Sequence, residues 1–490
     1  MSILYKINCD DNVAVALEPI KKGAVIHDIE IQDDIPFGHK VLLADLKKGD
    51  KIIKYGNPIG SLKCDACAGS HIHEHNLKTD LNEIKTYDFS KNENLYQYQN
   101  TDLCFDGYVR EDGRTAVRNE IWIIPTVGCV NNTVRALEKA AAKMNFDECD
   151  GVFAYTHPYG CSQMGCDQEN TRKILASLIN HQNAGGVLVV SLGCENTNIK
   201  ELKKYLGKIN EKRVKFLVLQ DSEDEMEDGI KFLKELYSYV KTFRRQKLSA
   251  DNLAVGFKCG GSDAFSGITA NALCGKLTDR LVSFGAKAVL TEVPEMFGAE
   301  HILMKRAENK QVFDAISAMI NAFKKYFADH NQECYENPSP GNHDGGITTL
   351  EEKSLGCIQK GGNAVVTDVL GYGEHVRKKG LTLLTGPGND IVSTTNLTCA
   401  GADIILFTTG RGTPLGAPVP TVKISSNSEL YRRKKNWIDF NAGDLIGDND
   451  IETTVDSLLS EILEIASGRK TKNEMNHYRE IAIFKDGVIM

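Results

Sequence analysis

No segment of the sequence has the roughly 18 uninterrupted apolar residues that a membrane-spanning helix needs. The N-terminus, Met1–Ile7, also lacks the apolar core of a secretory signal. No basic block suited to nucleic acid or an anionic membrane occurs, and the formal net charge of −8 is small for 490 residues. These absences argue against nucleic acid and membranes as partners. We therefore expect a cytoplasmic protein.

Two phosphate-binding signatures are missing as well. The sequence has no GxxxxGK[ST] loop and no GxGxxG directly after an apolar run. Its hydrophobic content of 41% and charged content of 25% are those of an ordinary globular protein. Because 490 residues exceed what one hydrophobic core usually organises, the length predicts two or three domains.

The fourteen cysteines do not predict a disulfide framework. In a reducing compartment we expect free thiols that are buried, nucleophilic or metal-ligating. Among the cysteines beside Gly or Glu, we single out Cys161, Cys194 and Cys259. Cys64 and Cys67 form a lone CxxC without a second pair at zinc-finger spacing, so we leave them outside the site.

The N-terminal segment contains an internal repeat. Residues 17–26 match residues 43–52, and a weaker copy covers residues 64–72. Each copy is a short turn that ends in glycine and leads into a strand. This pattern predicts a small β domain over residues 1–84.

The last copy leads into a histidine-rich phrase. If the strand continues, its two-residue period places Ile72 inward and His71, His73 and His75 on the opposite face. Two histidines at i and i+2 can chelate one ion, although three span too far on a straight strand. We predict a metal-binding or substrate-facing role for His73 and His75; a solvated histidine edge is the alternative.

Beyond a polar segment that we interpret as a linker, residues 85–103, the sequence alternates short apolar runs with helical stretches. This alternation predicts two α/β domains, residues 104–250 and 251–490, with largely parallel sheets flanking a cleft and a C-terminal helical tail. The runs are residues 121–125, 151–155, 186–192, 254–257, 288–291 and 404–407.

Residues able to bind a metal follow these runs. Cys129 follows the first, His157 and Cys161 the second, and Cys194 with Glu195 the third. Ligands of parallel sheets gather at the carboxyl ends of the strands, so we predict a shared site there. The predicted metal ligands are His157, Cys161, Cys194, Glu195 and Cys259.

Glycine loops recur in the second half, at residues 260–262, 386–390 and 410–412. Such loops can cradle an anion with backbone N–H groups, and Arg411 can hold a carboxylate with two hydrogen bonds. We therefore predict substrate contacts at Gly260, Gly261, Ser262 and Asp263.

Longer motifs carry a resemblance over nearly the whole chain. They are Gly107–Arg114, Pro125–Asn131, Tyr159–Gln163, Glu292–Glu300, Glu336–Asn342, Thr348–Ser354 and Thr409–Pro414. With these motifs the chain resembles the altronate and galactarate dehydratase family, and its N-terminal repeat is similar to that family's SAF (β-clip) domain. The phrase His71–Asn76 is typical of the altronate branch.

The resemblance implies a hydro-lyase that uses ferrous iron or manganese. Such an enzyme removes the proton α to the carboxylate of a sugar acid and expels the β-hydroxyl, here converting D-altronate to 2-keto-3-deoxy-D-gluconate. A divalent ion stabilises the developing enediolate. The predicted catalytic residues are His157, Glu195, Glu292 and Arg411. The predicted substrate-binding residues are His73, His75, Gly260, Gly261, Ser262, Asp263, Asn337, Asn342 and Lys353.

Several alternatives stay open from the sequence. The substrate could be galactarate, and either His157 or a glutamate could be the base. The enzyme could be an iron–sulfur lyase with Cys161, Cys194 and Cys259 as cluster ligands, although their spacing is unlike that of ferredoxins. A non-catalytic sugar-acid-binding protein is a further class, and a homo-oligomer is possible.

Overall fold

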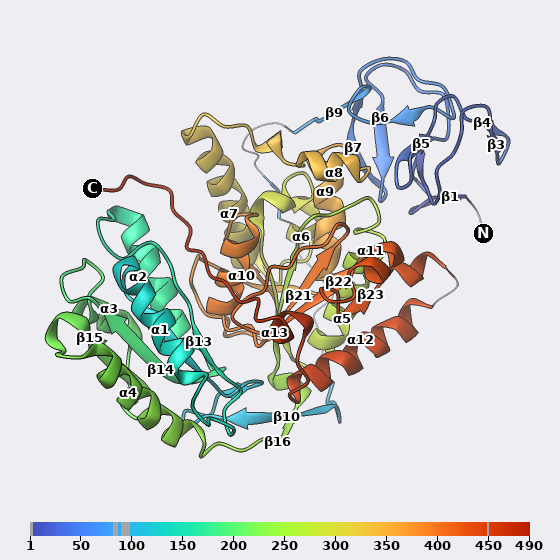
Figure 1. Cartoon of the computed structure of the whole chain (residues 1–490). Coiled ribbons are helices and arrows are strands. Elements are labelled where there is room, and N and C mark those ends of the chain that lie inside the picture. The colour runs from blue at the N-terminus through green and yellow to red at the C-terminus, as the bar shows by residue number, and fades with distance from the viewer. Residues whose placement is uncertain (1–2, 82–86, 90–98, 448–449) are drawn as a thin grey trace.

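The computed structural model describes residues 3–81, 87–89, 99–447 and 450–490, and its chain forms three successive parts (Figure 1). The first part is a set of small antiparallel sheets, ordered β1-β2-β5-β8, β6-β7-β9 and β3-β4. Its strands are β1 (Leu4–Tyr5), β2 (Val13–Ala16), β3 (Val25–Ile26), β4 (Ile29–Glu30), β5 (Lys40–Leu42), β6 (Lys51–Lys54), β7 (Asn57–Leu62), β8 (His71–Ile72) and β9 (Leu77–Lys78).

The internal repeat has a clear conformational cause. The three repeat glycines, Gly23, Gly49 and Gly69, have φ angles of 84°, 91° and 86°, in the left-handed region that glycine adopts without strain. At Gly69 a Cβ atom would lie 2.0 Å from the carbonyl oxygen of Glu30. Each repeat therefore needs glycine to complete its turn.

The prediction of a continued strand through the histidine phrase is wrong. Strand β8 ends at Ile72, and the chain turns because the side chain of Asn76 accepts from the His73 amide and donates to the His71 carbonyl. Ile72 is buried as predicted. The turn brings the histidine rings closer together than a straight strand would allow.

The second part contains a four-stranded parallel sheet in the order β13-β12-β14-β15. The apolar runs of β12 and β14 are buried throughout, as expected for central strands covered on both faces. Its elements are β12 (Glu120–Pro125), α1 (Asn131–Ala141), β13 (Val152–Ala154), α2 (Gly165–Asn180), β14 (Ala184–Ser191), α3 (Ile199–Leu206), β15 (Val214–Val218) and α4 (Glu225–Val240).

A separate antiparallel sheet joins the start and the end of this part. Strand β10 (Cys104–Val109) pairs with β11 (Thr115–Ala116) on one side and with β16 (Gln246–Ser249) on the other. The chain therefore enters and leaves the second part at neighbouring strands, next to the third part (Figure 1).

The third part is built on a seven-stranded parallel sheet, ordered β19-β20-β18-β17-β21-β22-β23. The prediction of α/β architecture after a small β domain is confirmed. Its strands are β17 (Ala254–Cys259), β18 (Lys287–Leu290), β19 (Val366–Leu370), β20 (Gly380–Leu384), β21 (Ile404–Thr409), β22 (Thr421–Ser425) and β23 (Phe440–Asn441). Its helices are α5 (Ala270–Ser283), α6 (Glu300–Met304), α7 (Lys310–Asp329), α8 (Pro340–Asp344), α9 (Leu350–Cys357), α10 (Asp390–Cys399), α11 (Ser428–Arg433), α12 (Ile451–Ala466) and α13 (Lys472–Met475).

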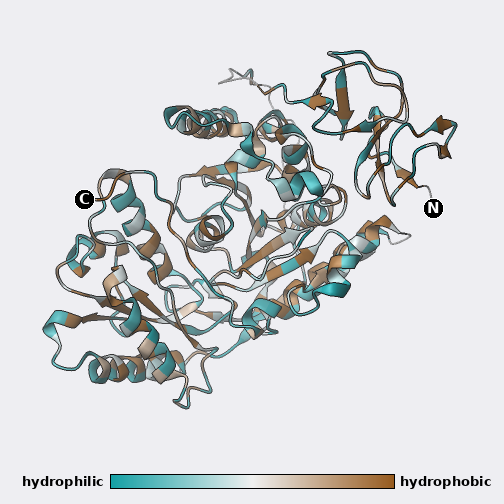
Figure 2. Cartoon of the chain, turned by 45° about the horizontal axis from the view of Figure 1, so that its top comes forward, coloured by the Kyte–Doolittle hydropathy of each residue, from teal (hydrophilic) through white to brown (hydrophobic). Residues whose placement is uncertain are grey.

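Hydrophobic residues concentrate on the strands and on the inward faces of the helices (Figure 2). This distribution follows from burying one stripe of each helix against a sheet. In the described ranges, no helix combines the length and the apolar character that crossing a membrane requires.

The C-terminal segment returns from the third part to the second (Figure 1). The buried carboxylate of Asp167, on α2, accepts hydrogen bonds from the amides of Asp486 and Gly487 at 2.8 Å each. The amide of Met490 donates to the carbonyl of Ser162. The final residues thereby tie the two α/β parts together.

The predicted linker, residues 85–103, lies largely outside the described residues, which omit 82–86 and 90–98. The described piece contacts the third part: the Tyr87 hydroxyl donates to Glu300 at 2.6 Å, and the Phe89 ring lies 5.4 Å from that of Phe313.

Candidate active site

A buried group of thiols and carboxylates lies at the carboxyl ends of β17 and β18, in the middle of the seven-stranded sheet. Cys259 is the last residue of β17. Glu292 follows β18 with a φ of 73°, a left-handed conformation that costs a residue with a Cβ free energy. Such strain is retained where the surroundings fix it, and it often marks a functional position.

Cys259, Glu295 and Cys357 meet at one point. The Cys259 and Cys357 sulfurs are 3.3 Å apart and lie 2.9 and 3.1 Å from the same Glu295 oxygen. All three residues are buried, and among the described residues they are the one group of three potential metal ligands within 4.8 Å of one another. Two thiols and a carboxylate suit a soft or borderline divalent ion, so this triad could hold a metal.

Lysines surround the triad and set its charge. Lys360 donates to the Cys259 sulfur at 2.9 Å, and Lys353 forms an ion pair with Glu295 at 3.0 Å. The hydrogen bond with Cys357, helped by Lys360, lowers the pKa of Cys259 to about 7 against the effect of burial. Burial opposes ionisation of Glu295, but Lys353 and Lys360 outweigh it and lower its pKa to about 2. Two of the three donors are therefore poised to be anionic near neutral pH.

Glu292 is the neighbouring acid. Its carboxylate accepts from the Cys259 amide at 2.9 Å and pairs with Lys258 at 2.9 Å, while Lys258 also pairs with Asp390. Burial and the nearby charge of Glu295 raise the pKa of Glu292 well above its ordinary value. A carboxylate shifted in this way can take up and release a proton closer to neutral pH.

Three predicted substrate-binding residues surround the triad. Lys353 donates to Asn337 at 2.7 Å and to Asn342 at 3.2 Å. Asn342 in turn donates to the carbonyl of Ser262 at 2.8 Å. The Ser262 hydroxyl is buried without a hydrogen-bond partner in the part of the chain that the structure describes. It is available for a ligand.

The other predicted residues of the glycine loops differ in their surroundings. Asp263 is engaged within the protein, because it accepts from Ser266, Ser426 and Asn427. Gly260 and Gly261 complete the loop, and the Gly261 carbonyl accepts from the amide of Arg411. The Arg411 side chain is exposed and lines a cavity of about 340 Å³.

The N-terminal domain closes over this region. Glu352, on α9, is buried between Lys40 at 2.9 Å and Lys54 at 2.7 Å. His73 is buried and contacts the carbonyl of His343, on α8, at 3.0 Å. α8 also carries Asn342, so the N-terminal domain contacts the helix that reaches the buried group.

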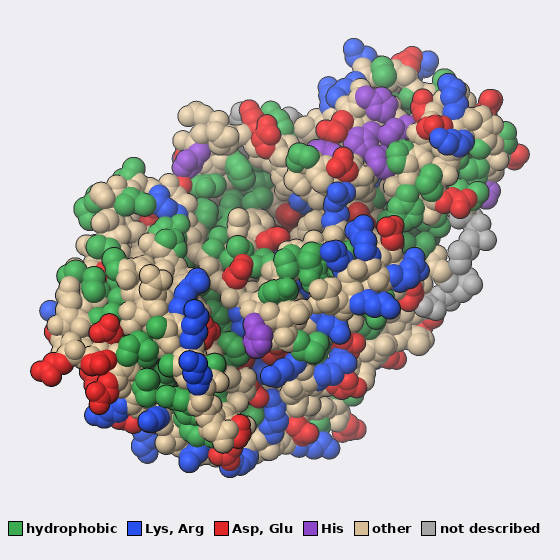
Figure 3. Space-filling view, in the orientation of Figure 1, with side chains coloured by type: hydrophobic (Ala, Val, Ile, Leu, Met, Phe, Trp, Pro, Cys, Tyr) green, Lys and Arg blue, Asp and Glu red, His purple; other side chains and the backbone are tan. Residues whose placement is uncertain are grey.

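His75 is exposed, and its ring lies 5.5 Å from that of His71. Together with His39, whose Nδ1 is 2.9 Å from His71 Nε2, these rings form a histidine group on the N-terminal domain (Figure 3). Burial, together with neighbouring histidines, lowers the pKa of His39 to about 4 and that of His71 to about 3. They are therefore neutral at pH 7.

In the second part, the side chains of His157 and Glu195 form hydrogen bonds within the protein. His157 Nε2 contacts the Pro125 carbonyl at 2.9 Å, Nδ1 accepts from the Tyr159 amide at 3.2 Å, and burial lowers its pKa to about 4. Glu195 accepts from Thr126, Ser191 and the Gly193 amide. Their predicted catalytic and metal-binding roles stay predictions, although binding an ion through either nitrogen of His157 would break one of its hydrogen bonds.

The five predicted metal ligands therefore do not converge. Cys259 belongs to the buried triad, whereas His157, Cys161, Cys194 and Glu195 lie at the edge of the other parallel sheet. Glu295 stands in a sequence motif without a predicted role, and Cys357, Lys258 and Lys360 were not among the predicted site residues. The signal available was the phrase Gly356–Gly361, in which a cysteine and a lysine stand between glycines.

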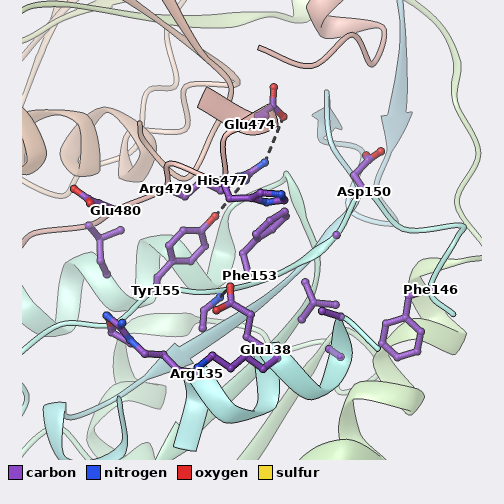
Figure 4. A pocket seen from close by; sticks show the side chains of 18 of the residues that line it. Arg135, Glu138, Phe146, Asp150, Phe153, Tyr155, Glu474, His477, Arg479 and Glu480 are labelled. Atoms are coloured by element: carbon purple, nitrogen blue, oxygen red, sulfur yellow. Dashed lines mark hydrogen bonds and ion pairs between the residues drawn. The ribbon is translucent and has the colours of Figure 1, made fainter. Parts of the chain in front are cut away.

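A separate cleft lies elsewhere, and no residue of the triad lines it. It measures about 960 Å³ and runs between α1, β13 and the C-terminal segment. Figure 4 shows Arg479 and Tyr155 on one wall, with the Arg479 guanidinium 3.9 Å from the centre of the Phe153 ring. Arg479 also pairs with the buried Glu120, so it joins the second part to the C-terminal segment.

Comparison with known proteins covers all three parts. Residues 3–80 match the altronate/galactarate dehydratase SAF domain, residues 107–241 the second domain of D-galactarate dehydratase/altronate hydrolase, and residues 250–489 the C-terminal domain of D-galactarate/altronate dehydratase.

Full-length relatives agree with these matches. The chain is 50% identical to altronate dehydratase of Bacillus subtilis over the whole of both chains, and 46% identical to altronate dehydratase of Escherichia coli over 99% of each. It is 31% identical to the L-threo-forming galactarate dehydratase of Escherichia coli, over 98% of this chain and 96% of the relative. The chain belongs to the altronate and galactarate dehydratase family of hydro-lyases.

Proposed function

We propose that the protein is an altronate dehydratase, which converts D-altronate to 2-keto-3-deoxy-D-gluconate and water. The observation that carries this proposal is the identity of 50% over the full length of a relative with that name, against 31% for the galactarate enzyme. The histidine phrase at residues 71–76 supports the same branch.

The reaction requires removal of a weakly acidic proton α to a carboxylate. We propose that Cys259, Glu295 and Cys357 hold ferrous iron or manganese, with iron favoured by the two thiols. When bound, such an ion supplies Lewis acidity toward the carboxylate and the developing enediolate. This assignment keeps Cys259 from the sequence prediction and adds two residues to it.

We assign proton transfer to Glu292. Its raised pKa supports a role as general base. The ammonium group of Lys258, 2.9 Å from its carboxylate, stabilises the ionised form. Lys353, Asn337 and Asn342 supply donors for the substrate carboxylate and hydroxyls. Arg411, exposed beside the start of α8, is proposed to attract the carboxylate of the incoming sugar acid.

His157 and Glu195 are proposed to hold the strand-end loops of the second part instead of transferring the proton. Their hydrogen bonds to Pro125, Tyr159, Thr126 and Ser191 support this role. A His157 that ligates an ion or relays a proton stays an alternative for mutagenesis to test.

Anaerobic turnover of a panel of aldonic and aldaric acids tests the proposal. We expect 2-keto-3-deoxy acid from D-altronate, little from galactarate, loss of activity on chelation, and recovery with ferrous iron. Equal or faster turnover of galactarate would contradict the substrate assignment. Full activity after exhaustive metal removal would contradict the metal assignment.

A further inference from the structure

Three exposed cysteines lie in the loops that follow three neighbouring strands of the four-stranded sheet. Cys129 follows β12, Cys161 follows β13 and Cys194 follows β14. Because β12 lies between β13 and β14 and all three run parallel, their carboxyl ends share one edge. The proposed dehydration does not use these thiols.

Hydrogen bonds join the three cysteine loops directly. The Gly128 amide donates to the Tyr159 carbonyl at 2.9 Å, which links the Cys129 loop to the Cys161 loop. The Thr197 amide donates to the Gly160 carbonyl at 3.0 Å, which links the Cys161 loop to the Cys194 loop. The three thiols are therefore carried by one connected unit.

The side chain of Asn196 adds a second link between two of these loops. Its Oδ1 accepts from the Ser162 amide at 2.9 Å and lies 3.5 Å from the Cys161 sulfur. Gly160 permits the close approach of the Cys161 loop to Thr126, which precedes the Cys129 loop, since its φ is 103° and a Cβ atom there would lie 1.9 Å from the Thr126 carbonyl oxygen.

The harder potential metal ligands at this edge, His157 and Glu195, already form hydrogen bonds within the protein. Both ring nitrogens of His157 contact the backbone, and Glu195 accepts three hydrogen bonds from its own loops. What faces outward is a set of thiols, which as thiolates select iron–sulfur clusters, zinc or copper(I) over hard ions.

The separation of the three thiols argues against a single bound ion. A single ion bound at about 2.3 Å needs its sulfurs roughly 4 Å apart. Cys129, Cys161 and Cys194 do not form a group within 4.8 Å among the residues described, unlike the triad of the third part. A cluster is larger than one ion and bridges a wider set of thiolates.

We propose that Cys129, Cys161 and Cys194 bind an iron–sulfur cluster at this edge, with one iron left without a protein thiolate. Each of the three thiols loses its proton to solvent and bonds to one iron, and four inorganic sulfides bridge two ferrous and two ferric ions, which gives a cluster core of charge 2+ without an oxidant. Cys259, which belongs to the buried triad, is not a ligand. The inference rests on the second part of the chain and does not depend on the proposed reaction.

The test measures iron and acid-labile sulfide on full-length protein purified anaerobically, before and after reconstitution with equal amounts of ferrous and ferric iron and with sulfide. We expect both elements, together with broad visible absorbance. Cys129→Ser, Cys161→Ser and Cys194→Ser should each lose most of the absorbance and labile sulfide. Cys64→Ser, which changes an exposed cysteine of the N-terminal domain, should keep them, as should Cys259→Ser.

Circular dichroism of each variant checks that the fold is retained. Iron without labile sulfide in the reconstituted wild type would overturn the cluster assignment, and so would an unchanged cluster in all three folded variants. Cys166 is a further exposed cysteine, at the start of α2, and loss of the cluster in Cys166→Ser would overturn the assignment of only three thiolates. Altronate turnover is a separate measurement, so a failed reaction and a failed cluster give different results.

Discussion

The two parallel sheets of this chain present different chemistry at the same topological position. At the carboxyl edge of the seven-stranded sheet, Cys259, Glu292 and Glu295 are buried and surrounded by lysines. At that edge of the four-stranded sheet, Cys161 and Cys194 are exposed while the nearby His157 and Glu195 are buried. Strand order brings residues to an edge in both cases.

What covers each edge causes the difference. α8, α9 and the N-terminal domain lie beside the first edge, and Lys40 and Lys54 of that domain pair with Glu352 on α9. Burial makes an unpaired charge costly there, and Glu292, Glu295 and Glu352 each have a lysine partner. At the second edge the acid and the imidazole bond to their own loops, which leaves the thiols outward.

The sharpest test of this comparison is Glu292→Gln. If Glu292 transfers the proton, turnover should fall by roughly 10²–10⁴ while the fold is retained. Steady-state kinetics with a melting curve on the same preparation measure both. Asp390→Asn is the matched control, since it removes the other carboxylate paired with Lys258. A Glu292→Gln enzyme with near-normal kcat would remove Glu292 from the mechanism.

The second test concerns the cover. Glu352→Gln should destabilise the protein by about 3–5 kcal/mol, because two buried ammonium groups lose their shared counter-charge. Denaturant unfolding measures this effect. Glu74→Gln, at an exposed carboxylate of the same interface, should change stability by less than about 1 kcal/mol. Equal stabilities of the two variants would contradict the idea that the ion pairs of Glu352 with Lys40 and Lys54 hold the N-terminal domain against α9.

The stability of the protein should depend on pH in different windows through the buried Glu352 and the buried His157. Lys40 and Lys54 outweigh burial and lower the pKa of Glu352 to about 2, from an ordinary value of 4.5. Its contribution is present above pH 4.5 and is lost as the pH falls toward 2. Glu352→Gln should therefore flatten the loss of stability in that window. Unfolding free energies of wild type and variant at several pH values check it.

The smallest expected effect belongs to His157→Gln. Burial lowers the pKa of His157 to about 4, so the unfolded state binds the proton first as the pH falls from 6.5 and stability drops toward pH 4. The variant should lose about 1–3 kcal/mol at pH 7 and show a weaker drop over that window. The folded fraction should turn over normally.

Specific activity, bound metal and melting temperature on one preparation decide the role of His157. A fall in turnover of roughly 10²–10⁴ without loss of stability would instead indicate proton relay. Parallel loss of metal and activity would indicate ligation.

The local sequence determined much of the architecture. Alternating apolar runs and helical stretches predicted the two parallel sheets, and the repeat glycines predicted the turns of the N-terminal domain. Long motifs were enough to indicate the family, which the full-length relatives then established. Strand ends also predicted where Cys129, Cys161, Cys194 and Cys259 lie, since a parallel sheet fixes which loops share an edge.

Only the tertiary structure decided which of those residues meet. Cys357 reaches Cys259 from 98 residues away, and Lys360 from 101 residues away, through contacts that no local period encodes. The same holds for His157: its sequence position suggested a catalytic imidazole, but its neighbours decide whether its nitrogens are free. Periodicity sets which face a residue takes, whereas partners distant in sequence set its charge, burial and available donors.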